Sequence, residues 1–395
     1  MELQLLNQFK MLNWPKYSNK EINLVNKIIK SGKVNQWTGE YVKKFEKKFC
    51  NFFKLKHSIA VANGTLGLEA AIYSLNLKRN AEIIVTPRSF IASASSVLKM
   101  NHKPVFSDVN INSQNIELEN IKKVVTKKTK AIICVHLAGY PTNMKAIMNY
   151  ARKKNIYVIE DCSQAHGAKL NNKFVGTYAD ISVWSFCQDK IISTLGEGGI
   201  VATDNEKLYY RLLSYRDHGK NFNNLSKIKN LNQFSYINDY IGTNIRMTEI
   251  QAAVGFVQLD YLNNWIEKRN DIIKYLEKRL CKIKKGILLI KNPKNIKHAY
   301  YRYYFFIRIE EFKKNWNYIK LINALRKKDK SLFIGGCPEI YNEKIFLKYK
   351  PKNKLINTIS LSNSSICIRI DQNMTKKRIN HISKSIKDIF LMAFK

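Results

Sequence analysis

One lysine of this chain, Lys190, stands where an amine could do covalent chemistry. It follows the apolar run DISVWSFC (residues 180–187) closely and precedes the glycine-rich segment GEGG (196–199). An amine in a partly desolvated pocket has a lowered pKa and can form a Schiff base with a carbonyl group. Ser185, shortly before it, could supply a hydrogen-bond donor to a phosphate. In a chain with 68 Lys and Arg residues, however, one lysine says little by itself.

A second candidate is the segment NGTLGLEAA, residues 63–71. An apolar strand is expected to end at Asn63, and Gly64 and Thr65 then open a helix. The free backbone N–H groups at a helix start, together with a hydroxyl, bind phosphate well. The same residues also suit an ordinary helix cap. Both interpretations stay open at this point.

A third candidate is the pair Glu160 and Asp161, in the segment VIEDCSQAHGA (158–168). Both acids lie at the end of an apolar strand, where a carboxylate without a partner is costly. A pyridinium nitrogen would be such a partner, because a neighbouring anion keeps the ring protonated and able to accept electrons. The alternative is a strand-end Asp that caps the next turn.

The elements that must position these residues alternate between strand and helix over residues 57–204. Short β-branched runs indicate strands, and the stretches between them have helical spacing. The expected strands lie near residues 57–63, 82–87, 103–109, 130–139, 157–162, 180–187 and 198–204, with helices near 65–75 and 142–154. Nearly all-apolar strands separated by helices predict an α/β fold with a mostly parallel sheet covered on both faces, which places ligands at the carboxyl ends of its strands.

The rest of the chain predicts a smaller α+β unit. Residues 247–280 have the apolar spacing of one long helix, residues 301–309 read as a strand, and the last twenty residues as a helix. We therefore expect a large domain over residues 1–260 and a small C-terminal domain over 261–395. The N-terminal segment is a candidate for packing on the small domain.

Composition limits the classes of function. The formal net charge is +38, but the lysines are scattered and no basic helix carries interleaved aromatic residues, so we expect no nucleic-acid partner. The seven cysteines form no CxxC pair, so we expect neither a metal site nor a disulfide framework. The sequence shows neither a signal peptide nor a membrane span, so we expect no membrane partner and a cytoplasmic protein.

Taken together, the three segments resemble the DegT/DnrJ/EryC1/StrS family of sugar aminotransferases, which have the fold-type-I architecture of pyridoxal-phosphate (PLP) enzymes. The similarity is dense over residues 14–270 and looser beyond residue 300. The other matching stretches are PRSFIASASSVLKMNHKPVFSDVN (87–110), LAGYPTNM (137–144), RDHGK (216–220) and GTNIRMTEIQAAVGFVQL (242–259).

The resemblance implies a role for each matching residue. Lys190 matches the lysine that binds PLP and shuttles protons, Asp161 the carboxylate on the pyridine nitrogen, and Gln164 its neighbour near the ring oxygen. Gly64, Thr65 and Ser185 match the phosphate site, and Phe90 matches the aromatic residue that stacks on the ring. Asn244 matches a residue that reaches the cofactor phosphate of the partner subunit, which implies a homodimer with shared active sites. His218 and Arg246 lie in matching segments and are assigned to the substrate region.

The resemblance also implies a reaction: transfer of an amino group, usually from glutamate, to a nucleotide-linked keto-deoxysugar, in amino-sugar synthesis for surface polysaccharide. Two alternatives are a sugar dehydratase, in which histidine replaces the lysine, and a catalytically silent regulatory relative. The run Cys187–Asp189 departs from the usual pattern and puts the substrate identity in doubt. Residues 335–344, GGCPEIYNEK, are expected to reach back over the site.

Overall fold

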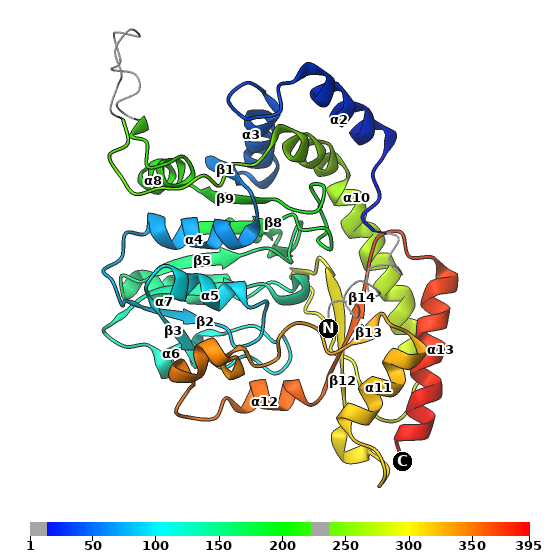
Figure 1. Ribbon diagram of the computed structural model, residues 1–395. Helices are drawn as coiled ribbons and strands as arrows, with labels where there is room; N and C mark the ends of the chain where they lie inside the picture. The colour runs from blue at the N-terminus through cyan, green and yellow to red at the C-terminus, as the bar shows by residue number, and fades with distance from the viewer. Residues whose placement is uncertain (1–13, 223–236) are drawn as a thin grey trace.

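A seven-stranded sheet forms the centre of the larger part of the protein (Figure 1). The computed structural model describes residues 14–222 and 237–395. In spatial order the strands are β1 (His57–Val61), β9 (Gly199–Thr203), β8 (Ile181–Ser185), β5 (Tyr157–Asp161), β4 (Thr129–Val135), β2 (Glu82–Val85) and β3 (Lys103–Phe106). β9 is antiparallel to both of its neighbours, and all the other pairs are parallel. The expected mostly parallel sheet is confirmed.

Helices cover both faces of this sheet, because successive residues of each strand point to opposite sides. In β1, Ile59 and Val61 pack into one apolar cluster, whereas Ala60 packs into another. The helices on the first face are α4 (Gly64–Ser74), α5 (Ala92–Lys99) and α8 (Glu206–Arg216). Those on the second are α3 (Tyr41–Phe53), α6 (Leu118–Val124), α7 (Met144–Lys153) and the first half of α10 (Glu249–Leu280).

The C-terminal part has a sheet and a core of its own. Its antiparallel sheet has the order β10 (Ile287–Leu288), β12 (Arg302–Ile307), β14 (Ser365–Arg369), β13 (Leu332–Phe333). Helices α11 (Tyr318–Lys328) and α13 (Lys376–Ala393) pack against it. A small third sheet joins β11 (Ile296–Lys297) to β6 (Lys169–Leu170) and β7 (Lys173–Phe174), and a short helix α12 (Ile356–Ser362) precedes β14.

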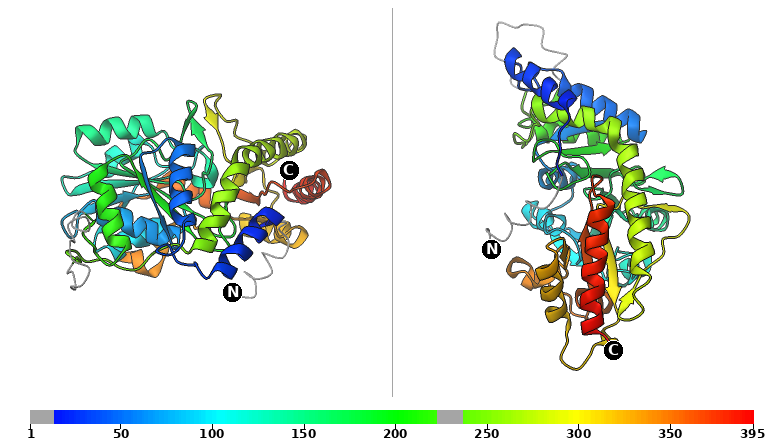
Figure 2. Two further views of the ribbon diagram at one scale, coloured as in Figure 1. Left: turned by 90° about the horizontal axis from the view of Figure 1, so that it is seen from above. Right: turned by 90° about the vertical axis from the view of Figure 1, so that its right-hand side faces the viewer.

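The long helix that the apolar spacing predicts is α10, and it connects the two parts (Figure 2). Its first half packs against α3 and α2 (Asn19–Ser31), and its second half packs against α13. The expected boundary at residue 260 lies within this helix, which therefore contributes to both cores.

The described part of the N-terminal segment packs on α10. The rings of Trp14 and Trp265 meet edge to face at 4.9 Å, and Glu21 accepts a hydrogen bond of 2.7 Å from the side chain of Gln258. Residues 1–13, where a signal peptide would begin, lie outside the described residues. Within the described ranges, no helix combines the length and the apolar character needed to cross a membrane.

A buried arginine on α10 is expected to stabilise the attachment of the C-terminal sheet. Arg269 is 1% exposed and donates hydrogen bonds to the carbonyls of Tyr300 and Ile370 (2.8 and 2.9 Å) and to Gln372 Oε1. In Arg269→Met these buried acceptors lose their donor, so urea denaturation should show a free energy of unfolding lower by roughly 2 to 4 kcal/mol. The exposed neighbour gives the control: Lys268→Met should change it by less than about 0.5 kcal/mol. Equal effects of the two substitutions would contradict this role of Arg269.

Candidate active site

A cavity of about 1400 Å³ opens at the carboxyl ends of the parallel strands, between the central sheet and the C-terminal part. Its walls hold Asp161 at the end of β5, Ser185 at the end of β8, and Tyr301 and Arg302 at the start of β12. Seven of the residues predicted from the sequence line it: Gly64, Thr65, Phe90, Asp161, Gln164, Ser185 and Lys190. The structure thus brings together residues that are up to 126 positions apart in the chain.

The start of α4 and the end of β8 form one wall of the cavity. A Cβ atom at Gly64 would lie 2.6 Å from Cβ of Ser185, so only glycine allows the helix start to approach this serine. Asn63 caps the helix by accepting the N–H of Leu66 at 2.9 Å, so the capping role belongs to Asn63 and not to Thr65. The positive end of the helix and two hydroxyl groups suit a phosphate at this place.

Asp161 presents a buried carboxylate to the cavity and is 4% exposed. Oδ2 accepts a hydrogen bond from the Ser93 hydroxyl at 2.9 Å, and Oδ1 accepts the N–H of Ser163 at 3.1 Å. The second contact is the turn cap considered as an alternative, and the role of Asp161 at a pyridinium nitrogen stays a prediction. These donors fix the direction of the carboxylate while leaving lone pairs for a cationic partner.

The neighbouring acid, Glu160, points away from the cavity. Its carboxylate accepts the backbone N–H groups of residues 176, 178 and 179 and lies 3.1 Å from Nε2 of His136. Burial alone would raise the pKa of Glu160, but His136 and these backbone donors lower it. Cys162 completes a group whose ligand atoms lie within 4.8 Å of one another, yet burial raises the pKa of its thiol well above the ordinary value. The contacts of Glu160 give it a structural role.

Phe90 and Gln164 line other parts of the cavity. Phe90 follows β2 and is 63% exposed, so its ring is available to a ligand. Gln164 is oriented through Oε1, which accepts the N–H of Ala138 at 2.7 Å. The segment 335–344 reaches back over this region, as expected: the N–H of Cys337 donates to the carbonyl of Ser89 at 3.1 Å. Gly335, Gly336, Cys337 and Glu343 all line the cavity.

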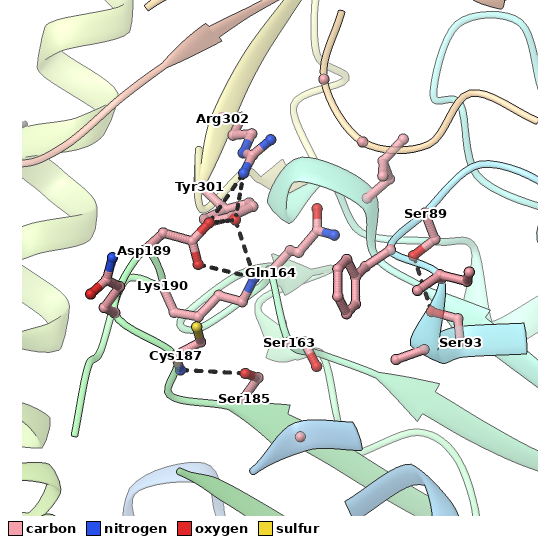
Figure 3. A pocket seen from close by; sticks show the side chains of 18 of the residues that line it. Ser89, Ser93, Ser163, Gln164, Ser185, Cys187, Asp189, Lys190, Tyr301 and Arg302 are labelled. Atoms are coloured by element: carbon pink, nitrogen blue, oxygen red, sulfur yellow. Dashed lines mark hydrogen bonds and ion pairs between the residues drawn. The ribbon is translucent and has the colours of Figure 1, made fainter. Parts of the chain in front are cut away.

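The amine of Lys190 lies among polar groups (Figure 3). Nζ donates to the hydroxyl of Tyr301 at 3.1 Å and lies 3.4 Å from Oδ1 of Asp189. The lowered pKa expected for this amine is wrong for this arrangement. Burial disfavours the ammonium form, but Tyr301 and Asp189 outweigh burial and raise the pKa of Lys190 above its ordinary value.

Three predicted residues lie elsewhere. Among the residues that the structure describes, Asn244, His218 and Arg246 do not line the cavity. They gather near Asp217, which forms an ion pair with Arg246 and a β-bridge with Asn244. His218 and Asn244 are exposed. A contribution of these residues to a site shared with a partner chain stays a prediction.

The sequence alone did not reveal several residues of the cavity. Ser93 and Ser163 hold Asp161, and Tyr301 and Arg302 reach the site from β12. The one signal available was the presence of polar side chains in the run YRYYFFIRI, which is otherwise suited to a buried strand.

The cavity defines a class of protein. A helix start and Ser185 suit a phosphate, Asp161 suits a pyridinium nitrogen, and Lys190 suits an aldehyde, so the residues present fit PLP. When bound, PLP supplies an electron sink for negative charge at the reacting carbon. Fold and site together are those of a fold-type-I PLP enzyme.

Comparison with known proteins identifies the family. The chain belongs to the DegT/DnrJ/EryC1/StrS aminotransferase family, whose family model matches residues 15–387. It is 34% identical over 287 residues to a GDP-perosamine synthase of Escherichia coli O157:H7, covering 73% of this chain and 75% of that protein. It is 35% identical over 277 residues to a GDP-4-keto-6-deoxy-D-mannose 3-dehydratase of Yersinia pseudotuberculosis, covering 66% and 70%.

A solved structure is similar over nearly the whole chain. This is an aminotransferase from Psychrobacter cryohalolentis, with a TM-score of 0.92 and 36% identity, covering 96% of this chain and 99% of that one. The predictions of the family, of the fold-type-I architecture, of PLP as the cofactor and of an aminotransferase are therefore confirmed.

Asp161 is expected to contribute strongly to cofactor affinity. Asp161→Asn keeps the shape of the side chain but removes the charge that would face the pyridinium nitrogen. A charge-assisted hydrogen bond contributes about 1.5 to 3 kcal/mol, so the Kd for PLP should rise by roughly ten- to hundredfold. Titration of the cofactor-free protein with PLP, followed by absorbance, measures this. Asp271→Asn, an exposed change on α10, is the control and should leave the Kd within twofold. An unchanged Kd in Asp161→Asn would refute the assignment.

Proposed function

We propose that this protein transfers the amino group of glutamate to the keto carbon of a nucleotide-linked keto-deoxysugar. The observation that carries the proposal is that Lys190, Asp161 and Ser185 line the same cavity. The relatives support the substrate class, because a GDP-perosamine synthase shares 34% of aligned residues with this chain. The cavity of about 1400 Å³ is large enough for a ligand of this size.

The chain's own residues divide the work. Nζ of Lys190 accepts the proton that leaves Cα of the amino donor and returns a proton during the second half of the reaction. Asp161, which Ser93 and Ser163 hold, would bind the ring nitrogen of PLP. Ser185 and the start of α4 would bind its phosphate. Phe90 would shield the ring from water.

The identity of residue 190 weighs against the dehydratase alternative. In the dehydratases of this family a histidine stands at this position, and it cannot take the covalent role of an amine. Lys190 is present here, and its Nζ lines the cavity. The 35% identity to the Yersinia enzyme does not by itself decide between the two reactions, and the amine at residue 190 is the feature that favours aminotransfer.

The completeness of the cavity weighs against a silent regulatory relative. A protein that had lost catalysis would have no need to keep an amine, a buried carboxylate and a close glycine–serine contact facing the same space. Gly64 and Ser185 keep this contact, and Asp161 keeps both of its hydrogen-bond donors.

A homodimer with shared active sites is part of the proposal. Asn244 and His218 are exposed and lie outside the cavity of their own chain, so they are available to the site of a partner chain. Trp37, Tyr240 and Ile241 are also exposed, at 55%, 57% and 84%. Large apolar side chains in such positions are typical of surfaces that a partner covers.

We also propose the domain division 1–260 and 261–395, a cytoplasmic location and a role in surface-polysaccharide synthesis. The separate apolar cores support the division. All seven cysteines are free, which agrees with a reducing compartment.

The first half of the reaction has a direct optical test. With PLP bound, the protein should show a visible band that disappears when glutamate is added and returns when a suitable nucleotide-linked keto-sugar follows. Lys190→Ala should show neither change, because the amine is missing; Lys16→Ala, an exposed lysine, should behave like the unchanged protein. A band that does not respond to glutamate would exclude this amino donor.

Shared active sites predict complementation between two defective variants. Lys190→Ala removes the amine of a chain's own site, and Asn244→Ala weakens the site of its partner. Each mixed dimer contains one site with neither change. Half of the dimers are mixed when equal amounts of the two variants exchange subunits, so activity should recover to about a quarter of that of the unchanged protein. Light scattering should show a dimer. A monomer, or no recovery after subunit exchange, would contradict the shared site.

A further inference from the structure

Asp189 and Tyr301 contact the amine of Lys190, and Arg302 contacts both of these side chains (Figure 3). Besides its contact with Lys190, Asp189 accepts a hydrogen bond from the Tyr301 hydroxyl. It also forms an ion pair with Arg302, in which Oδ2 lies 3.1 Å from Nη2. The same Nη2 lies 2.9 Å from the Tyr301 hydroxyl. The carboxylate of Asp189 is therefore shared between two cations and one hydroxyl.

These side chains come from both parts of the protein. Asp189 lies in the loop after β8, immediately before Lys190, whereas Tyr301 and Arg302 lie at the start of β12 in the C-terminal sheet. Asp189 also belongs to the run 187–189 that departs from the usual family pattern. The proposed reaction assigns no role to this residue.

We propose that Asp189 is a positioning residue: together with Tyr301 it holds the amine of Lys190 in place as an ammonium ion, while Arg302 limits this hold by binding the same carboxylate. The inference rests on the proposed aminotransfer by Lys190. In this reaction Nζ of Lys190 must both accept a proton and return it. The amine therefore needs a balance between its charged and neutral forms, and this need is the physical basis of the inference.

The charges around the amine favour this division of roles. Burial would raise the pKa of Asp189, but Lys190 and Arg302 hold it well below the ordinary value, so Asp189 is ionised. An anion at 3.4 Å favours the ammonium form of Lys190, and a cation beside that anion weakens the effect. Arg302 acts from the C-terminal sheet, so the placement of β12 affects the amine.

The other titratable groups near the amine are less able to do this. In the same loop, burial raises the pKa of both the Cys187 thiol and the Glu197 carboxyl. From the loop after β5, His166 has a pKa of about 3, because burial and then the charge of Lys190 disfavour its cationic form. Arg369, a further cation, is paired with Arg302 on the neighbouring strand β14. Asp189 is thus the ionised acid in contact with the amine.

The test measures the reactivity of Lys190 in the full-length, cofactor-free protein. Trace acetic anhydride acetylates neutral amines, and mass spectrometry of the peptide containing Lys190 gives the rate at each pH. In Asp189→Asn the ammonium form loses its anion, so the rate at pH 8 should rise about ten- to hundredfold. In Arg302→Met the Asp189 carboxylate no longer has a second cation to bind, so it favours the ammonium form of Lys190 more strongly. The rate of acetylation of Lys190 should then fall about threefold or more. Glu343→Gln, which removes a charge elsewhere in the cavity lining, should change it less than twofold.

The pH profile separates the proposal from a merely structural role. A change in access to Lys190 would alter the rate equally at every pH, whereas a change in protonation moves the profile along the pH axis. Opposite displacements in Asp189→Asn and Arg302→Met support the proposal. No displacement, or displacement of both in the same direction, overturns it. If Asp189→Asn fails to fold, Tyr301→Phe should still raise the rate, and an unchanged rate would overturn the proposal.

The holoenzyme gives a second readout. The visible band of bound PLP titrates with the nitrogen of Lys190, and its midpoint should be lower in Asp189→Asn than in the unchanged protein. Neither measurement needs glutamate or a sugar. A negative result would therefore leave the proposed aminotransfer untouched, while failure of glutamate to bleach the band would leave the labelling result valid.

Discussion

The pairing of β5 with β8 is the constraint on which the site depends. In this parallel pair Asp161 stands beside Val183, so Ser185 lies two residues further along the neighbouring strand. A strand rises about 3.3 Å per residue, so the register fixes the separation between the Asp161 carboxylate and the Ser185 hydroxyl. The side-chain alternation along β5 then sends Glu160 to the opposite face, where it binds the loop 176–179. One strand therefore supplies both an acid that lines the cavity and an acid with a structural role.

The central sheet makes only half of the cavity, and α10 determines where the other half lies. This helix contributes to both apolar cores, and its buried Arg269 reaches backbone carbonyls next to β12 and β14. These strands begin or end at the cavity with Tyr301, Arg302 and Arg369. Through its contacts with both cores, α10 thus helps to place Tyr301 and Arg302 in the same cavity as Lys190.

The electrostatics of the site depends on carboxylates that contact several partners at once, and not on isolated ion pairs. Asp161 is held by neutral donors and keeps its charge available for a ligand, whereas Asp189 divides its charge between Lys190 and Arg302. Charged groups that are largely buried, as Lys190 and Asp189 are, interact more strongly than they would in bulk water, so the partners of each carboxylate matter more than its mere presence. The overall charge of +38 says nothing about this balance.

The sequence by itself determined the class of fold and the cofactor, and it predicted seven of the residues that line the cavity. Apolar runs alternating with helical spacing specify a parallel sheet, and a parallel sheet places its ligand-binding residues at one edge. Local signals of this kind identified Gly64, Asp161, Ser185 and Lys190, because the first three lie at a strand end or a helix start and Lys190 lies in the loop that follows β8. Tertiary structure alone decided the state of the Lys190 amine. Tyr301 and Arg302 lie more than one hundred residues away in the sequence, and only the packing of the C-terminal sheet against the large sheet brings them to it.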